Sequence, residues 1–338
     1  MPADDRDDYA LKRIETTGGL FALLFRQLFR QYLKMLSLQI TRAMDAGKSL
    51  SIVDALNAKK ITTGIKYAVS TGNWGIQKQS SQNGVAQILT RMNYLAGISH
   101  LRRINTPINR EGKLPKPRQL SASHCGVLCP VETPEGQACG LVENLALLAH
   151  TRLGYNGSCV ADVLLSRGWM LPLSVGKRGH WRVAINGSLE GVTEDGLALV
   201  CKLRQCRMNL MLPLDTSIAT HPDQRIVSVD TDAGCLLRPL FVKSELHALP
   251  KLMRTVPPYK LWNELLVRGV VQLIDKNEEK NIEIGSTHME LHPSCLLGIC
   301  AGMIPFLNHN QAPRNTRPSF VELTVSATPP THIEWSSN

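Results

Sequence analysis

The hydrophobic pattern changes near residue 153, and this change limits the folds open to the chain. Before it, a long helix is predicted from Gly19 to about Ala46, because residues 20–44 (LFALLFRQLFRQYLKMLSLQITRAM) contain no glycine or proline and Gly47 is a natural stop. After it, residues 153–232 hold short β-like runs such as CVADVLL, HWRVAING and QRIVSVDTDAG, divided by Gly, Asn and Asp. Helical patterns broken by proline return at residues 243–275. The sequence therefore predicts a mixed, multidomain α+β fold.

The predicted long helix has two unlike faces. A spacing of four residues places a cationic set, Arg26, Arg30 and Lys34, on one face and an apolar set, Leu24, Leu28, Tyr32 and Leu36, on another. A solvated cationic face on a helix that packs into a core explains this pattern better than contact with phosphate groups does.

Composition narrows the possible partners. The chain of 338 residues has a formal net charge of +10, which favours an anionic partner such as nucleic acid or an acidic protein. Aromatic residues make up 5%, which is low for a module that binds single strands mainly by base stacking. No apolar run approaches the ~18 residues that a membrane span needs. The nine cysteines, with no secretory signal before them, indicate free and mostly buried thiols in a reducing compartment.

A cation-rich loop follows a second predicted helix. Residues 81–103 predict a helix that starts near Asn83 and weakens around Gly97. Residues 105–120 (NTPINREGKLPKPRQL) predict a loop, which we call the basic loop. Between Ser99 and Gln119 the acid is Glu111 and the cations are Arg102, Arg103, Arg110, Lys113, Lys116 and Arg118. Such a surface attracts phosphate backbones without reading sequence, although a merely solvated loop has the same composition.

The stretch CGVLCPVETPEGQACGLVENL (125–145) raises the question of a metal or acid–base site. Cys125 and Cys129 supply only half of a zinc-binding arrangement, so we expect buried thiols and no zinc. Glu132 and Glu135 flank a turn and lack the layout of carboxylates that bind Mg²⁺ or transfer protons. Glutamates at such a turn more often bind amides or pair with arginine, so the residues alone do not indicate catalysis.

An amide-rich turn lies in HPSCLLGICAGMIPFLNHNQAPRNT (292–316). Residues 295–307 predict core, and the polar residues that follow are Asn308, His309, Asn310, Gln311, Arg314 and Asn315. Polar residues this dense usually line a site or join two domains. A guanidinium there could grip a triphosphate in a geometry that lysine cannot reproduce. The sequence contains no Walker loop, G-x-G-x-x-G, H-E-x-x-H or nucleophile elbow.

Several stretches together resemble one family. Residues 5–18 (DRDDYALKRIETTG), 71–75 (TGNWG), 84–120, 125–150 and 292–316 are similar, in this order, to second-largest, beta-type subunits of multisubunit DNA-dependent RNA polymerases of eukaryotic, archaeal or large-DNA-virus type. The resemblance implies a partial chain in which a helical protrusion and fork segment precedes β-rich external domains. The implied segments are the protrusion (1–57), the fork domain (58–150), a β-rich external domain (151–242), a helical second external domain (243–284), the start of the hybrid-binding region (285–316) and a divergent tail (317–338).

The resemblance also implies roles for the candidate residues. Arg314 would contact the phosphates of the incoming nucleotide, and the cations Arg102, Arg103, Arg110, Lys113, Lys116 and Arg118 would bind nucleic acid at the fork. Glu132, Glu135 and Gln137 would be structural supports near the active centre. The resemblance implies no catalytic or metal-binding residue in this chain and no zinc. The Mg²⁺ of the assembled enzyme would be held mainly by the largest subunit.

The implied function is a share in the nucleotidyl transfer of a DNA-directed RNA polymerase, with the fragment inactive alone. The implied partners are the largest and other polymerase subunits, the DNA template, the RNA–DNA hybrid and nucleoside triphosphates, with no membrane. The location would be the nucleus in a eukaryote, and otherwise the cytoplasm, a virion or a viral factory. The chain departs from the family at Cys125, at Glu143 and after Thr316. The departure after Thr316 leaves open a non-catalytic, truncated assembly or nucleic-acid-binding module.

Overall fold

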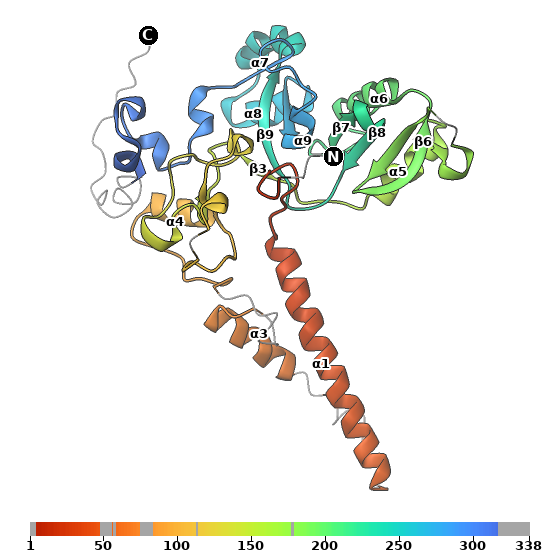
Figure 1. Cartoon of the computed structure of the whole chain (residues 1–338), viewed down its shortest axis with the longest axis vertical. Coiled ribbons are helices and arrows are strands. Elements are labelled where there is room, and N and C mark those ends of the chain that lie inside the picture. Colours follow the sequence, from red (N-terminus) through yellow and green to blue (C-terminus); the bar gives the residue numbers. More distant parts are fainter. Residues whose placement is uncertain are drawn as a thin grey trace. The chain divides into compact units, whose positions relative to one another are not determined.

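The computed structural model describes residues 5–47, 56, 59–74, 84–112, 114–176 and 179–316. The chain forms two compact units, of which one is Glu15–Thr90 and the other is Met1–Ile14 together with Arg91–Asn338. Figure 1 shows both helices and strands, and the predicted mixed α+β class is confirmed. The segment 317–338, expected to diverge, lies outside the described residues. The six predicted segment boundaries stay predictions.

The smaller unit is built on two helices. Helix α1 (Thr17–Asp45) confirms the predicted long helix, and Leu24 and Leu28 on it pack against α3 (Lys59–Thr71). Gly64 on α3 permits this close approach, because a β-carbon there would lie 2.3 Å from a methyl carbon of Leu28. Gly47 follows the end of α1 with a φ of 62°, the left-handed conformation that a glycine stop requires.

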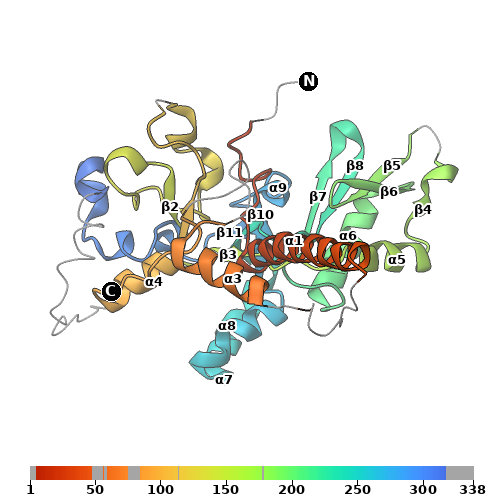
Figure 2. The ribbon, with the colours of Figure 1, turned by 90° about the horizontal axis from the view of Figure 1, so that it is seen from below.

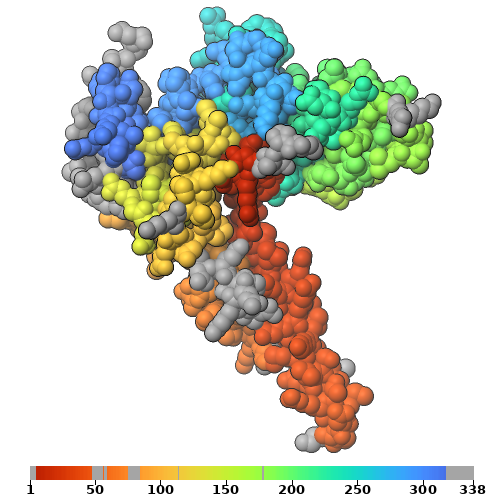
Figure 3. Space-filling view, viewed as in Figure 1, coloured from red at the N-terminus to blue at the C-terminus, as the bar shows by residue number. Residues whose placement is uncertain are grey.

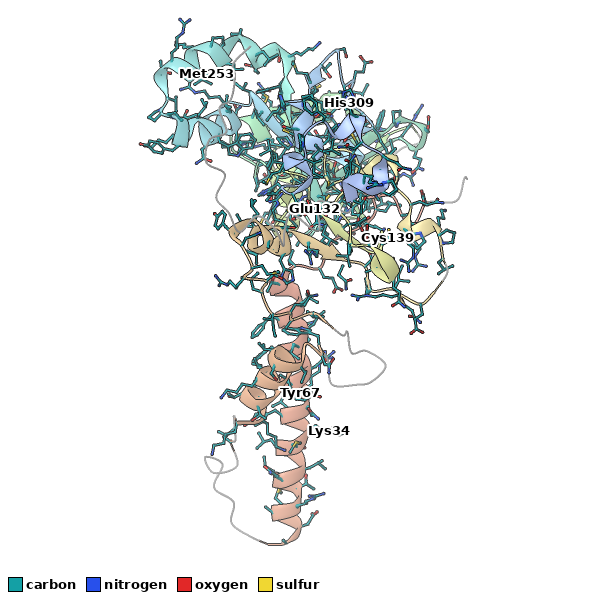
Figure 4. The ribbon with its side chains drawn as sticks, turned by 90° about the vertical axis from the view of Figure 1, so that its left-hand side faces the viewer. Lys34, Tyr67, Glu132, Cys139, Met253 and His309 are labelled. Atoms are coloured by element: carbon teal, nitrogen blue, oxygen red, sulfur yellow. The ribbon has the colours of Figure 1, made fainter. Side chains whose placement is uncertain are left out.

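The two predicted faces of α1 are both present. The cations Arg26, Arg30 and Lys34 are exposed, as a solvated face requires, and Figure 4 labels Lys34. On the apolar face Leu24 and Leu28 are buried, while Tyr32 and Leu36 are half-buried. The helix also exposes further large apolar side chains, namely Phe21, Leu23, Phe25, Phe29 and Leu33. Among the described residues, no helix combines the length and apolar character of a membrane-spanning segment.

The helix predicted over residues 81–103 is wrong for most of its length. Helix α4 runs only from Tyr94 to Leu101, and residues 84–93 are not helical. The start of α4 is set by Asn93, whose side chain accepts a hydrogen bond from the N–H of Ala96 at 2.6 Å. The helix therefore starts at the cap formed by Asn93, although the residues before Asn93 also have a helical periodicity.

A five-stranded sheet forms the body of the β-rich region. Its order is β4 (Leu171–Pro172), β6 (Ser188–Thr193), β5 (Trp181–Ile185), β8 (Ile226–Asp230) and β7 (Ser217–His221), with β5 and β8 parallel and the other neighbours antiparallel. Helices α5 (Ser158–Ser166) and α6 (Gly196–Met208) pack on this sheet (Figure 2). Strands β5 and β8 confirm the predictions for HWRVAING and QRIVSVDTDAG.

The strand predicted for CVADVLL (159–165) is wrong, because these residues belong to α5. Val160 and Leu164, four residues apart, are buried in the core, whereas Val163 and Leu165 are 39% and 43% exposed. This is the burial pattern of one helical face. A short apolar run fits a strand or a helix equally well, so the sequence alone could not separate the two.

A second sheet is centred on β9 (Leu236–Val242). This strand pairs antiparallel with β10 (Val271–Asp275), β11 (His288–Met289) and β3 (His150–Thr151). Helices α7 (Leu249–Thr255), α8 (Pro258–Val267) and α9 (Lys276–Glu279) complete this region. The helices predicted within 243–275 are confirmed, but its last residues form β10. Pro250 and Pro258 begin helices rather than break them, because the first turn needs no N–H donor.

Buried ion pairs join the two sheets. Arg207 on α6 and Glu278 on α9 bind each other through two hydrogen bonds, each 2.8 Å long. Arg152 is fully buried, donates to the hydroxyl of Ser217 on β7 at 2.5 Å and lies 3.5 Å from the carboxylate of Asp275 on β10. Charges buried this deeply require such partners, so these contacts fix the sheets against each other.

The nine cysteines, all described, are free. Four are buried (Cys129, Cys206, Cys235 and Cys300), and four are exposed (Cys125, Cys139, Cys159 and Cys201). The prediction of mostly buried thiols is therefore wrong, and Cys125, which was expected to be buried, is exposed. Burial raises the pKa of Cys235 to about 12.

Candidate nucleic-acid interface

The basic loop rises from a two-stranded ladder. Strand β1 (Arg103–Asn105) pairs antiparallel with β2 (Val142–Asn144), and the N–H of Thr106 extends the ladder by donating to the Leu141 carbonyl at 2.8 Å. The chain turns at residues 109–112 and returns through a 3₁₀ turn, Lys116–Arg118. Apart from this turn the described residues form a loop, as predicted. Figure 3 shows this part of the chain, in yellow, at the molecular surface.

Two of the predicted nucleic-acid-binding cations are open to solvent. Arg110 is exposed, and its guanidinium makes no ion pair with any residue that the structure describes. The side chain of Lys116 is 73% exposed and lies 3.6 Å from the carboxylate of Asp5. Lys113 lies outside the described residues. The charges of Arg110 and Lys116 are therefore available to a phosphate backbone.

Arg102 and Arg103 are half-buried at the foot of the loop. The Nη2 atom of Arg102 donates to the carbonyl oxygens of Ala146 at 2.6 Å and Leu147 at 3.2 Å. Burial lowers the pKa of Arg102, and the nearby carboxylate of Glu132 acts in the opposite direction. The Nε atom of Arg103 is buried and has no hydrogen-bond partner among the described residues. In this structure Arg102 is thus held by backbone carbonyls.

Arg118 is also held by backbone carbonyls. Its guanidinium donates to four carbonyl oxygens, those of Gln137 (2.7 Å), Cys139 (2.8 Å), Arg110 (3.0 Å) and Gly112 (3.5 Å). Gly140, with a φ of 70°, leaves room for the Arg118 backbone, because a β-carbon there would lie 2.4 Å from the Arg118 carbonyl oxygen. The basic loop and the turn at Gly136–Ala138 therefore form one packed assembly.

Glu132 is a buried carboxylate between α4 and β2. It is 5% exposed, and its Oε1 atom accepts a hydrogen bond from the hydroxyl of Ser99 on α4 at 2.6 Å. Its carbonyl oxygen accepts from the side-chain amide of Asn144 on β2 at 3.0 Å. The Oε2 atom is buried and has no hydrogen-bond partner within the described part of the chain. Glu132 thus connects α4 and β2. These contacts are those of a residue that supports the surrounding structure.

Glu135 and Gln137 lie at the surface. Both side chains are exposed, and Glu135 precedes the 3₁₀ turn Gly136–Ala138 without a side-chain hydrogen bond to it. The carbonyl oxygen of Gln137 accepts a hydrogen bond from the guanidinium of Arg118. Figure 4 labels Glu132 and Cys139 at either end of this segment. The expected position of Glu132, Glu135 and Gln137 near an active centre stays a prediction.

Residues 292–316 begin against Glu132. A β-carbon at Gly298 would lie 2.4 Å from the Oε2 atom of Glu132 and 3.2 Å from the β-carbon of Cys129. The N–H of Leu147 donates to the carbonyl of Leu297 at 2.8 Å. Burial raises the pKa of the Cys129 thiol, which lies in this contact. The segment that carries the amide-rich turn is therefore packed directly on Cys129, Glu132 and Leu147.

The core predicted for residues 295–307 is only partly present. Cys300, Ala301 and Ile304 are buried, whereas Phe306 is 76% exposed. Phe306 has a φ of 52°, in the left-handed region that a bulky side chain rarely adopts. Its ring contacts that of His309 edge-on, with 6.0 Å between ring centroids. The aromatic residue thus ends the buried run and belongs to the surface turn.

The amide-rich turn is mostly exposed. Its exposed members are Asn308, His309, Asn310, Gln311 and Arg314, and Figure 4 labels His309. Asn315 is buried, and its side-chain amide donates to the carbonyl of Leu307 at 2.9 Å. Arg314 lies in the helical residues 312–316, and its side chain has no ion pair with the residues that the structure describes. Arg314 is therefore presented to solvent from an anchored turn.

The structure brings only some of the predicted residues together. Arg118 contacts the backbone of Gln137, and Arg102 lies within electrostatic reach of Glu132. Arg314 belongs to the same compact unit as the basic loop but makes no hydrogen bond through its side chain to the other predicted residues that are described.

Contacts that sequence reasoning missed join the start of the chain to His124, Glu143 and Asp232. The hydroxyl of Tyr9 donates to the carboxylate of Glu143 at 2.7 Å, and the Tyr9 ring packs edge-on against His124. Arg13 donates to Asp232 at 2.5 Å. These partners lie 134 and 219 residues apart in the chain, so no local pattern could indicate them.

Comparison with known proteins matches the regions that carry this geometry. The family description "RNA polymerase Rpb2, domain 3" matches residues 87–151, which include the basic loop and Glu132, and "RNA polymerase Rpb2, domain 4" matches residues 183–244. The chain is 36% identical to DNA-directed RNA polymerase II subunit RPB2 of Encephalitozoon cuniculi, over 93% of this chain and 30% of that relative.

Two other relatives extend the match to plants and archaea. DNA-directed RNA polymerase II subunit 2 of Arabidopsis thaliana is 36% identical over 93% of this chain and 29% of its own length. DNA-directed RNA polymerase subunit Rpo2 of Sulfolobus acidocaldarius is 36% identical over 93% of this chain and 30% of its own length. The chain thus spans about 30% of the length of these relatives. It belongs to the family of second-largest subunits of multisubunit DNA-dependent RNA polymerases and corresponds to a part of such a subunit.

Proposed function

We propose that this chain takes part in template-directed RNA synthesis as a fork-side portion of an RNA polymerase, and that it is inactive alone. The observation that carries the proposal is the basic loop, in which exposed Arg110 and Lys116 stand on a base held by β1, β2 and two half-buried arginines. Cations fixed on a packed base bind phosphates with a smaller loss of conformational freedom than cations on a mobile loop.

The loop suits electrostatic binding of nucleic acid. Arg110 and Lys116 would neutralise phosphates, and the released counterions would make the affinity depend on salt. The other arginines would mainly support the loop, since backbone carbonyls bind the guanidiniums of Arg102 and Arg118. Arg103 would take the same part. Lys113 would add a further charge. Glu132 would keep α4 and β2 in place below the loop, and Glu135 and Gln137 would shape the adjoining turn.

Arg314 would bind the phosphates of an incoming nucleoside triphosphate. An exposed guanidinium that has no competing carboxylate among the described residues can form paired hydrogen bonds to phosphate oxygens. Asn315 anchors its turn, and the contact between Gly298 and Glu132 ties the same segment to the fork. The role in nucleotidyl transfer would be to orient the triphosphate rather than to donate or accept a proton.

Mg²⁺ would be supplied elsewhere in the enzyme. In the part of the chain that the structure describes, no three His, Cys, Asp or Glu side chains are grouped so that they could hold a metal ion. We propose that Mg²⁺ is held mainly by the largest subunit. The proposed partners of this chain are the largest and other polymerase subunits, DNA, the RNA–DNA hybrid and nucleoside triphosphates. The location would be nuclear in a eukaryote, and otherwise the cytoplasm, a virion or a viral factory.

The proposal is tested by placing Arg314→Ala and Arg110→Ala in the assembled polymerase that contains this chain. Arg314→Ala should raise the apparent KM for nucleotides, whereas Arg110→Ala should weaken the binding of forked DNA with less change in that KM. Arg254→Ala removes an exposed arginine of α7 and serves as the charge-matched control. If both variants elongate RNA as the control does, the assigned roles are wrong.

A second candidate function is a non-catalytic assembly module. The observation that favours it is the set of exposed apolar side chains on α1, which suits contact with another protein surface. A polymerase that synthesises RNA equally well without this chain would support the module, and a requirement for the chain would support the main proposal.

A further inference from the structure

We infer that Arg118 is a positioning residue whose guanidinium fastens the turn at residues 109–112 of the basic loop to the turn at Gly136–Ala138. The consequence for nucleic-acid binding rests on the function proposed above. The fastening itself rests on hydrogen bonds within the chain.

The four hydrogen bonds of Arg118 divide between its two terminal nitrogen atoms. Nη1 donates to the carbonyls of Gln137 and Cys139, at 2.7 and 2.8 Å, and so holds the second turn. Nη2 donates to the carbonyls of Arg110 and Gly112, at 3.0 and 3.5 Å, and so holds the first turn. Each terminal nitrogen carries two N–H groups, so all four are engaged and only the Nε–H remains. A phosphate would have to displace these bonds.

The backbone around Arg118 supports the same arrangement. Its N–H donates to the Pro115 carbonyl at 3.0 Å, which closes the 3₁₀ turn that carries Lys116. On the other side, the N–H of Cys139 donates to the Gly136 carbonyl at 3.1 Å. Arg118 therefore bridges two turns that are each closed by their own backbone bonds, and it sets the positions from which Arg110 and Lys116 project.

Lysine at position 118 would keep the charge but not the bridge. A guanidinium is a rigid planar fork with donors on two nitrogen atoms, whereas an ammonium is a compact point charge on a flexible stem. One ammonium cannot serve carbonyls on both turns with the same geometry. Arg118→Lys therefore separates positioning from electrostatic attraction, because a residue that merely attracts phosphate would tolerate this change.

Hydrogen exchange in the full chain tests the positioning role directly. In Arg118→Lys and in Arg118→Ala, amide protons of residues 109–112 and 137–141 should exchange about tenfold faster than in the wild type. Arg254→Ala, an exposed arginine of α7, should leave both turns unchanged. Wild-type exchange at both turns in Arg118→Lys would overturn the inference.

Binding of a labelled DNA fork, a duplex with two unpaired arms, tests the consequence. Arg118→Lys should lose as much affinity as Arg118→Ala, even though its net charge is unchanged. Wild-type affinity in Arg118→Lys together with a loss in Arg118→Ala would show a phosphate ligand instead. If the wild-type chain does not bind the fork at any salt concentration, the proposed function fails, and hydrogen exchange still decides the positioning role.

Discussion

Gly298 lies against the carboxylate of Glu132, at a point where a β-carbon on residue 298 would be 2.4 Å from Oε2. The contact joins the segment that carries Arg314 to Glu132, which connects α4 and β2. The Oε1 atom of Glu132 accepts a hydrogen bond from Ser99, and its backbone carbonyl accepts one from Asn144, so Glu132 has little room to move aside. The absence of a side chain at position 298 is therefore a condition for packing these two segments together.

Replacement of this glycine tests that contact. We expect Gly298→Ala to lower the free energy of unfolding by about 1–3 kcal/mol, because the added methyl group overpacks a buried site. Gly302→Ala is the matched control, since a β-carbon at Gly302 would meet no atom within 4 Å. Urea unfolding followed by circular dichroism measures both. Equal unfolding free energies of the two variants would show that the Glu132 side chain moves aside without loss of stability.

The ion pair between Arg207 and Glu278 provides a second test. Both residues are nearly fully buried and share two hydrogen bonds of 2.8 Å. Glu278→Gln leaves the buried guanidinium without its counter-charge, so we expect a loss of about 3–5 kcal/mol in unfolding free energy.

The exposed pair of Arg268 and Glu264 on and next to α8 is the control for that experiment. Its residues are four apart on the helix surface, where such pairs contribute about 0.5 kcal/mol. Glu264→Gln should therefore change the unfolding free energy by a small fraction of the loss in Glu278→Gln. Losses of similar size would contradict the role assigned to the buried pair.

Histidine 124 makes stability depend on pH. It is 6% exposed, and its Nδ1 atom lies 3.9 Å from Oε1 of Glu143. Burial lowers the pKa of His124 below its ordinary value of 6.5; of the neighbouring charges, Lys12 and Lys276 act in the same direction, and Glu143 and Asp7 oppose it.

The sign of the pH effect follows from this shift. The unfolded chain binds a proton at His124 more readily than the folded protein does, so protonation favours unfolding. The stability that neutral His124 contributes is fully present above about pH 6.5 and is lost as the pH falls toward the folded pKa. In His124→Gln, the unfolding free energy should fall less between about pH 7.5 and pH 5.5 than in the wild type. Equal pH profiles would contradict this assignment.

Local patterns predicted much of the fold. The absence of glycine and proline in residues 20–44 predicted α1, and the β-like runs ending at turn residues predicted β5 and β8. The errors occur where local information is ambiguous. CVADVLL is too short to separate strand from helix. The Asn93 cap starts α4 in the middle of a helical periodicity that the sequence shows both before and after Asn93.

The candidate site was predicted by composition but not in its internal arrangement. The basic loop was evident from its cations, and Arg110 and Lys116 are exposed as a phosphate-binding surface requires. The contacts of Arg102 with the carbonyls of Ala146 and Leu147, and those of Arg118 with Gln137 and Cys139, join residues 19 to 45 positions apart, and no spacing rule predicts them. The same reason hid the contact between Tyr9 and Glu143.

The most direct test of the central claim is the salt dependence of DNA-fork binding by this chain. For Arg110→Ala combined with Lys116→Ala, the slope of log K against log salt concentration should be shallower than in the wild type by about 1.8, the value for two lost phosphate contacts. Lys251→Ala combined with Arg254→Ala, on exposed positions of α7, should leave the slope unchanged. The same slope in both double variants would contradict the proposal that the basic loop is the nucleic-acid interface.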